Sequence, residues 1–292
     1  GSKNATGAAL ATGYRNTNIV LGIIVIIIMA ICVFSIVEIN PPTQSAGKSS
    51  LVKDISSLVK NKYYIMFLGE VFFLFLGYLS MYGAMQYYYT YIVGDVSGMS
   101  LALTLLTLLA IPTMILAAYL NGKGIAKIKL IQFGAIVDII GYAILFFTSD
   151  GTIATAALGL IGLGFGFRSS MFFSMMPDIF DYTEWQVGRN LGGTQNAIQG
   201  FVNKVSSAAA SAIVSALLVW GNYDASKLDK AIADGVDIAT KYPQTHTAIN
   251  FAFGGLALVS TVMAVVVLLP YDLDKKYPQI RADLDKRHKE NA

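Results

Sequence analysis

The stretch PDIFDYTEWQVGRNLGG, residues 177–193, concentrates charge between two long apolar runs. It contains the acids Asp178, Asp181 and Glu184, followed by Arg189. Because the acids recur every third residue, a helix would place them on neighbouring faces, where like charges repel unless cations lie nearby. We therefore expect the stretch to end one apolar helix and to form the loop before the next, with its charges held in ion pairs.

The rest of the chain is too apolar for an ordinary soluble protein. Of the 292 residues, 55% are hydrophobic and 13% are charged, and the mean hydropathy is +0.58. An average globular domain carries about 25% charged residues. The net charge of +3 is too small to indicate a nucleic-acid partner. With Cys32 as the one cysteine, the sequence predicts neither a disulfide framework nor a metal site.

Seven apolar segments are long enough to cross a bilayer, since a spanning helix needs about 20 residues. They cover residues 18–37, 64–93, 101–120, 130–147, 153–176, 197–220 and 248–269. Backbone groups cannot remain unpaired in lipid, and no segment alternates in the manner of a barrel strand. The sequence therefore predicts an all-α integral membrane protein with about seven transmembrane helices.

The basic residues of the loops predict the orientation of these spans. If the spans alternate in direction, most basic residues fall on one side of the membrane. That side receives Lys48, Lys53, Lys60, Lys62, Lys123, Lys127, Lys129, Arg189 and the basic residues of the C-terminal tail. By the positive-inside rule this side is cytoplasmic, so we expect a multi-pass protein of the cell membrane with its N-terminus outside and its C-terminus inside.

Four charged residues, Glu70, Asp138, Arg168 and Lys204, fall within the predicted spans. A charge near the centre of a spanning helix costs about 2.5–3.5 kcal/mol on insertion scales, so it needs a partner or a water-filled cavity. Glu70 or Asp138 could meet the charge of Arg168 from a neighbouring helix. For Arg168 a purely structural ion pair and a contact with substrate remain equally open.

The charged stretch also resembles a known family pattern. The sequence DIFDYTEW at 178–185, followed by Gly188 and Arg189, is similar to the element that joins the tenth and eleventh helices of the glycoside–pentoside–hexuronide:cation symporters. These are relatives of the melibiose permease in the major facilitator superfamily. The sequence YYYTYIVGD at 87–95 resembles the end of the family's seventh helix, and Lys204 stands where the family carries a lysine in helix eleven.

This resemblance implies an organisation for the whole chain, with the seven spans as helices six to twelve of a twelve-helix transporter. Residues 1–38 would be an external segment and the last helix of the N-terminal half, 39–62 the central cytoplasmic loop, 63–271 the C-terminal six-helix bundle and 272–292 a cytoplasmic tail. In the family the first five helices hold the carboxylates for the coupling cation and much of the sugar site. We therefore expect a C-terminal portion that needs an N-terminal helical half as its partner and does not transport alone.

Polar residues receive expected roles, of which the resemblance implies that of Lys204, whereas the others follow from their places in the predicted spans and loop. The expected substrate and cation cavity consists of Lys204, Gln199, Asn203, Arg168 and Tyr88. The expected cytoplasmic gate, which would hold the outward-open state, consists of Asp178, Asp181, Tyr182, Glu184 and Arg189. Two simpler interpretations remain open, because Lys204 could snorkel to the membrane surface and Tyr88 could belong to an interfacial belt of tyrosines.

The predicted function is therefore Na⁺- or H⁺-coupled symport of a sugar or glycoside by alternating access. We expect no enzymatic activity, no cofactor besides the coupling cation, and no nucleic-acid partner. One alternative is the same fold moving a lipid or another organic solute, and a second is a membrane scaffold without transport. A third, an intramembrane enzyme, is supported only by Glu70 and Asp138.

Overall fold

The computed structural model describes residues 7–35 and 51–290 of the chain. These residues belong to two compact units, Gly1–Ser45 and Ala46–Ala292. Residues 36–50, which include the end of the first predicted span and half of the predicted central loop, lie outside the described residues. The domain boundaries expected from the sequence therefore stay predictions.

The first unit contains one long helix, α1 (Gly7–Ser35). Its apolar side chains, among them Ile26 and Phe34, are exposed. An exposed apolar surface of this length is unfavourable in water, whereas lipid or a partner helix would cover it. The helix thus has the character of the predicted first span.

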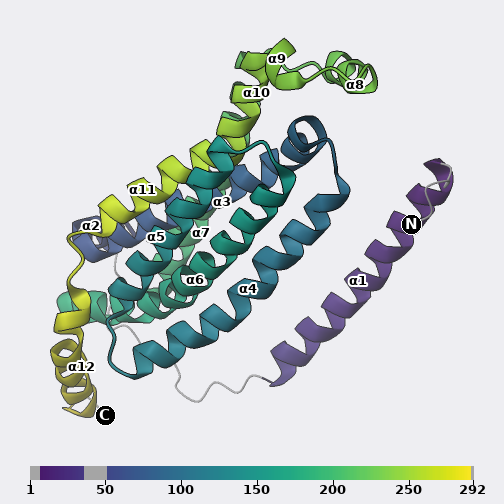
Figure 1. Cartoon of the computed structure of the whole chain (residues 1–292). Helices are drawn as coiled ribbons and strands as arrows, with labels where there is room; N and C mark the ends of the chain where they lie inside the picture. Colours follow the sequence, from purple (N-terminus) through teal and green to yellow (C-terminus); the bar gives the residue numbers. More distant parts are fainter. Residues whose placement is uncertain (1–6, 36–50, 291–292) are drawn as a thin grey trace. The chain divides into compact units, whose positions relative to one another are not determined.

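The second unit is a bundle of helices (Figure 1). Its elements are α2 (Leu51–Lys60), α3 (Lys62–Tyr87), the π-helix η1 (Tyr88–Val93), α4 (Ser97–Gly122), α5 (Lys127–Phe147), α6 (Gly151–Val187), α7 (Gly192–Trp220), α8 (Ala225–Ala233), α9 (Ile238–Lys241), α10 (Pro243–Asn250), the π-helix η2 (Phe251–Gly255), α11 (Leu256–Leu268) and α12 (Leu273–Glu290). Across both units, every regular element of the described residues is a helix, and seven helical runs are long and apolar enough to cross a membrane. The predicted all-α membrane fold is confirmed.

Helix α6 differs most from its predicted span. It is a continuous helix over Gly151–Val187 and does not end at Met176. At 1.5 Å per residue it extends about 55 Å, whereas the hydrocarbon core of a bilayer is about 30 Å thick. The prediction of a helix end and loop for residues 177–193 was therefore largely wrong. Most of this stretch is a helical extension, and only residues 188–191 connect it to α7.

Glycines let α6 approach its two main neighbours closely. Helix α6 packs against α4 and α5, whereas α3 packs against α7 and α11 (Figure 1). A Cβ added to Gly162 of α6 would overlap the carbonyl oxygen of Leu106 in α4. A Cβ added to Gly134 of α5 would lie 2.6 Å from the carbonyl oxygen of Gly164 in α6. Small residues therefore set how deeply α6 lies between its neighbours.

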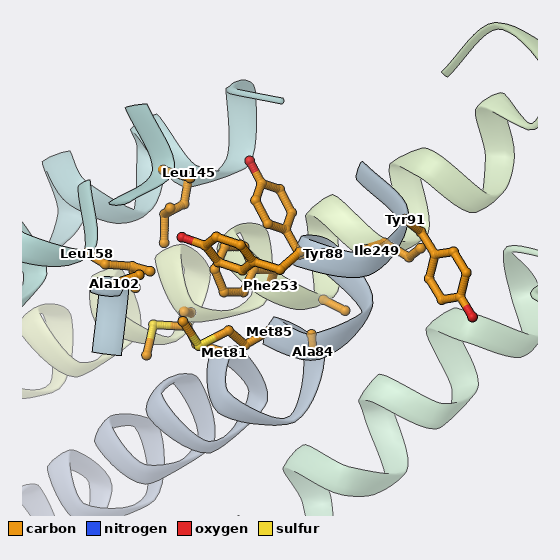
Figure 2. Packing of buried hydrophobic residues seen from close by; sticks show 14 of the residues in the cluster. Met81, Ala84, Met85, Tyr88, Tyr91, Ala102, Leu145, Leu158, Ile249 and Phe253 are labelled. Atoms are coloured by element: carbon orange, nitrogen blue, oxygen red, sulfur yellow. The ribbon is translucent and has the colours of Figure 1, made fainter. Parts of the chain in front are cut away.

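Tyr88 lies in the hydrophobic core and not in a cavity. Figure 2 shows its ring beside Phe253, with ring centroids 4.4 Å apart in a stacked arrangement. The Tyr88 hydroxyl donates a hydrogen bond to the carbonyl oxygen of Thr148 at 3.0 Å, and the side chain is fully buried. The predictions that Tyr88 lines the substrate cavity or belongs to an interfacial belt are both wrong. A buried tyrosine can satisfy its hydroxyl in this way while its ring packs like that of phenylalanine.

The two ends of the second unit are built differently (Figure 1). One end carries the short helices α8 and α9. At the other end, α2 lies against the start of α3 and against α7, and α12 packs against α6. We call these the α8 end and the α12 end. The sequence assigned residues 51–60 to a loop and 272–292 to a charged cytoplasmic tail with a possible helix after Pro278. In the structure, α2 and α12 are helices that pack on the bundle, and α12 already begins at Leu273.

Candidate functional site

A triad of charges lies inside the bundle. Arg168 of α6 donates from Nη2 to Glu70 Oε1 of α3 at 2.9 Å and from Nη1 to Asp138 Oδ2 of α5 at 3.0 Å. All three side chains are no more than 2% exposed. The sequence suggested either acid as the partner of Arg168, and the structure brings both acids to it. In this arrangement Arg168 faces other helices of its own bundle.

At the α12 end, the first acid of the 177–193 stretch pairs with α5. Lys127 Nζ lies 2.6 Å from Asp178 Oδ2 and also donates to the carbonyl oxygen of Ser174 at 2.8 Å. Asp178 is buried and Lys127 is mostly buried. Lys127 is one of the basic loop residues that the sequence placed on the same side of the membrane as this acid. The contact links the extension of α6 to the start of α5.

The other two acids of the stretch pair with α12. Arg281 lies 3.1 Å from Asp181 Oδ2, which also accepts a hydrogen bond from the Tyr277 hydroxyl at 2.7 Å. Glu184 Oε1 lies 2.6 Å from His288 Nε2. These contacts attach α12 to the helical extension of α6. The sequence gave no partner from α12, because nothing in the charged tail indicated that it packs on α6.

Arg189 does not pair with the acids of its own stretch. It forms an ion pair with Asp54 of α2. Because α6 continues as a helix to Val187, Arg189 lies beyond the helix end, in the short connection to α7. Closeness in sequence therefore did not decide its partner. The α12 end is instead held together by charges from α2, α5, α6 and α12.

Tyr182 contributes a ring contact to the α12 end. Its ring meets Tyr63 edge to face, with centroids 4.8 Å apart, and lies 6.0 Å from the ring of Trp185. Tyr63 in turn donates a hydrogen bond to Asp272, which also pairs with Lys276 at 2.8 Å. The hydrogen bonds from Lys276 and Tyr63 hold the pKa of the Asp272 carboxyl well below its usual range.

Thr183 is a buried hydrogen-bonding centre that the sequence reading missed. Its Oγ1 accepts from Asn61 Nδ2 and from Gln195 Nε2, both at 2.9 Å, and donates to the carbonyl oxygen of Ile179. Tyr64 donates to the Gln195 carbonyl at 2.8 Å. Asn61 also caps α3 through its side-chain oxygen. An asparagine just before an apolar run is a capping signal, but nothing in the sequence joins it to Thr183.

Lys204 lies on an exposed face of α7, whereas the same helix buries Ser206, Ala210 and Val214. Gln199 and Asn203 are half-buried. Among residues 7–35 and 51–290, no ion pair of Lys204 is present. Helix α7 begins at Gly192, earlier than the sequence predicted, so Lys204 lies near the midpoint of the helix, about 18 Å from its start. A lysine at this depth is poorly placed to reach the membrane surface.

A pocket of about 250 Å³ opens near the α8 end. It is lined by Gly83, Gln86, Tyr87, Thr90, Tyr91 and Tyr223. The Tyr223 hydroxyl donates to the Tyr91 hydroxyl at 3.1 Å. Aromatic rings, an amide and hydroxyl groups in one pocket are suited to a polar ligand with apolar faces. In the described part of the chain, no group of three or more histidine, cysteine or acidic side chains could hold a metal ion.

Comparison with known proteins places this architecture in a family. Residues 5–275 match the family described as MFS/sugar transport protein, so the chain belongs to that family. This confirms the resemblance to sugar symporters drawn from the DIFDYTEW stretch. It also agrees with the prediction that the chain is not an enzyme, because the family is one of transport proteins.

Three relatives align with nearly the whole chain. The isoprimeverose transporter of Lactiplantibacillus pentosus is 26% identical over 287 residues, which cover 97% of this chain and 57% of the relative. The inner membrane symporter YicJ of Escherichia coli (strain K12) is 26% identical, with 91% and 54% covered. The glucuronide carrier protein homolog of the same strain is 22% identical, with 98% and 60% covered. The chain thus spans little more than half the length of these relatives.

Proposed function

We propose that this chain is the C-terminal part of a secondary active transporter that carries a sugar or glycoside together with Na⁺ or H⁺. The observation that carries the proposal is the family match over residues 5–275. Seven candidate membrane spans and relatives named as transporter, symporter and carrier support it. The particular sugar would be one that offers hydroxyl groups and an apolar ring face.

The proposal includes a partner, an N-terminal helical half. The relatives support it because the chain covers only 57% and 54% of the length of two of them. The exposed face of α7 supports this, because Lys204 shares it with Gly200, Ser211 and Ser215. Leaving Lys204 in hydrocarbon near the middle of a span would cost about 2.5–3.5 kcal/mol. A water-filled cavity between two halves avoids this cost. In the proposed transporter, Lys204, Gln199 and Asn203 face that cavity, and the main cation site lies in the other half.

The α12 end would be the cytoplasmic end in this transporter, as the positive-inside rule predicts. The pairs made by Asp178, Asp181, Glu184 and Arg189 would then lie on the inner face, and Tyr182 would pack among them. We assign them to the cytoplasmic gate, which holds the outward-open state and loosens when the inner side opens. Differences of a few kcal/mol are enough to shift such an equilibrium.

The test is uptake by the full-length transporter that contains this chain, in cells or vesicles. A panel that includes isoprimeverose and a β-glucuronide is offered, while external pH and Na⁺ are recorded. We expect one sugar to evoke a cation flux. Lys204→Ala should lower accumulation by about tenfold, equivalent to about 1.4 kcal/mol, and Asp181→Asn should lower it less. Lys230→Ala on α8 is the matched control and should have no effect.

Two results would overturn parts of the proposal. If no sugar evokes a Na⁺ or H⁺ flux while a lipid or another organic solute is moved, the substrate class is wrong. If sugar uptake occurs but both variants accumulate as much as the unchanged protein, the site assignment is wrong while the family function stands.

A further inference from the structure

The Glu70–Arg168–Asp138 triad holds two acids against one base. Arginine stays protonated in proteins, so two ionised carboxylates would leave one uncompensated negative charge. Among the described residues, Glu70 Oε2, Asp138 Oδ1 and Arg168 Nε have no hydrogen-bond partner. These atoms are shielded from solvent. Each carboxyl therefore uses only one of its two oxygens in the pairing with Arg168.

No charged side chain from the surrounding helices offsets this excess. Helices α4, α11 and η2 contain no charged residue. On α7, Lys204 lies on the exposed face, and His246 of α10 bonds to Ser149 at the α8 end. Helix α12 packs against α6 at the α12 end, where its Arg281 and His288 pair with Asp181 and Glu184. The phenols Tyr78 and Tyr142 interact electrostatically with Asp138, and Tyr82 is hydrogen-bonded to Tyr78. Tyrosine, with an ordinary pKa of about 10, supplies no positive charge.

A buried, unpaired carboxylate is costly enough that the group takes up a proton instead. Where two carboxyls share one site, the second ionisation is opposed by both burial and the first negative charge. One carboxylate and one guanidinium form a neutral pair, so a single bound proton makes the triad neutral. The arrangement therefore accommodates a proton without any change in its two ion-pair contacts.

The geometry favours Asp138 as the residue that carries the proton. A Cβ added to Gly164 would overlap Asp138 Oδ1 and would lie 2.5 Å from the carbonyl oxygen of Gly134. The unpaired Oδ1 thus lies beside Gly164 in the contact between α5 and α6, and the Gly134 carbonyl oxygen lies beside the same glycine. Two acceptor oxygens repel each other, whereas a protonated carboxyl presents an O–H donor to a carbonyl.

We propose that the triad is a proton-binding site in the C-terminal bundle, in which Asp138 is protonated while Glu70 is ionised and paired with Arg168. The site is separate from any cation site in the other half of a transporter. It does not depend on which solute is carried. Its ligand is a proton, and its groups come from α3, α5 and α6, so binding or release would change the attraction among these helices.

The experiment uses infrared spectroscopy on the full chain in detergent micelles at neutral pH. A protonated carboxyl has a carbonyl band distinct from that of a carboxylate. We expect such a band in the folded protein, and we expect it to shift when aspartate is labelled with ¹³C in its side-chain carboxyl. Asp138→Asn should abolish the band. Asp285→Asn, on the exposed surface of α12, is the matched control and should leave it unchanged.

The isotope label keeps the test decisive even if Asp138→Asn fails to fold, because it is read in the unchanged protein. A protonated-carboxyl band that does not shift on aspartate labelling would place the proton on a glutamate and overturn the assignment. Absence of the band would mean that both acids are ionised. If the band is absent and the melting temperature rises with the Na⁺ concentration, the triad binds a metal cation instead of a proton. None of these readouts requires transport, so their failure is distinct from failure of the proposed function.

Discussion

The two charge networks of this protein use the same kinds of residue in opposite surroundings. In the triad, Arg168 meets Glu70 and Asp138 in a site with almost no solvent access. At the α12 end, the side chains of Arg281 and His288 are 52% and 49% exposed while they pair with acids of α6. Water therefore screens the pairs made by Arg281 and His288 and leaves the triad unscreened.

This difference indicates what each network is suited to do. A buried pair is costly to break, because its members are left charged and unsolvated, whereas an exposed pair contributes about 0–1 kcal/mol. The triad can therefore hold α3, α5 and α6 together through a conformational cycle. The exposed pairs that Arg281 and His288 form with α6 can open and re-form with little cost, as the proposed gate would require.

The largest expected effect comes from removing the base of the triad. Arg168→Gln should lower the free energy of unfolding by about 3–5 kcal/mol, because it leaves two carboxyls buried without their partner. Thermal melting of the purified chain in detergent measures this change. Arg281→Gln at the α12 end is the matched control. Equal melting temperatures for the two variants would contradict the distinction between the networks.

A smaller loss is expected at Thr183, which is buried at the α12 end but uncharged. Thr183→Val keeps the shape of the side chain and removes the acceptor for Asn61 and Gln195. Leaving buried donors unsatisfied costs about 1–3 kcal/mol. The melting temperature should therefore fall between the values for Arg168→Gln and Arg281→Gln. A melting temperature at or above that of the unchanged protein would show that the hydrogen bonds of Thr183 do not stabilise the fold.

The exposed pair itself should contribute little. A double-mutant cycle with Asp181→Asn and Arg281→Gln should give a coupling of about 0.2–1 kcal/mol, as for other solvent-exposed pairs. Raising the salt concentration from about 0.1 M to 1 M shortens the screening length from about 10 Å to 3 Å and should reduce this coupling. The same cycle on Glu70 and Arg168 should not respond to salt. A salt-independent coupling at Asp181 would remove the contrast between the networks.

The smallest effect concerns Asp272, whose pKa is lowered by hydrogen bonds from Lys276 and Tyr63. A lowered native pKa means that these contacts contribute fully above the ordinary carboxyl pKa of about 3.9 and are lost as pH falls toward the native pKa. The stability of the unchanged protein should therefore fall more steeply below about pH 4 than that of Asp272→Asn. Tyr63→Phe should show part of this effect. If the melting temperatures of Asp272→Asn and the unchanged protein fall in parallel as the pH is lowered, the hydrogen bonds to Asp272 do not contribute to stability.

Much of the fold was predictable because lipid permits few solutions. Long apolar runs in a bilayer must be helices, and the predicted spans correspond to helices of the structure. The need for a partner at Arg168 also followed from its place within a span. Boundaries were less predictable, as α6 shows. Counting apolar residues ended it at Met176, although amphipathic packing against α12 continues the helix to Val187.

The partners of the ion pairs could not be predicted from the sequence. Asp181 pairs with a residue 100 positions away and Glu184 with one 104 away. Arg189, close to both in the chain, pairs with Asp54 instead. The sequence allowed Tyr88 to belong to a belt or to line a cavity, and only its burial against Phe253 shows that it belongs to the core.

The sequence by itself determined that this chain is a helical membrane protein, and its DIFDYTEW motif indicated a sugar-transport family. Hydropathy and short motifs act locally, so they can be read along the chain. Only the tertiary structure decided that two acids surround Arg168, that α12 is attached to α6, and that Thr183 joins three helices. These outcomes depend on which surfaces meet when the helices pack, and close packing brings together residues that no spacing along the chain connects.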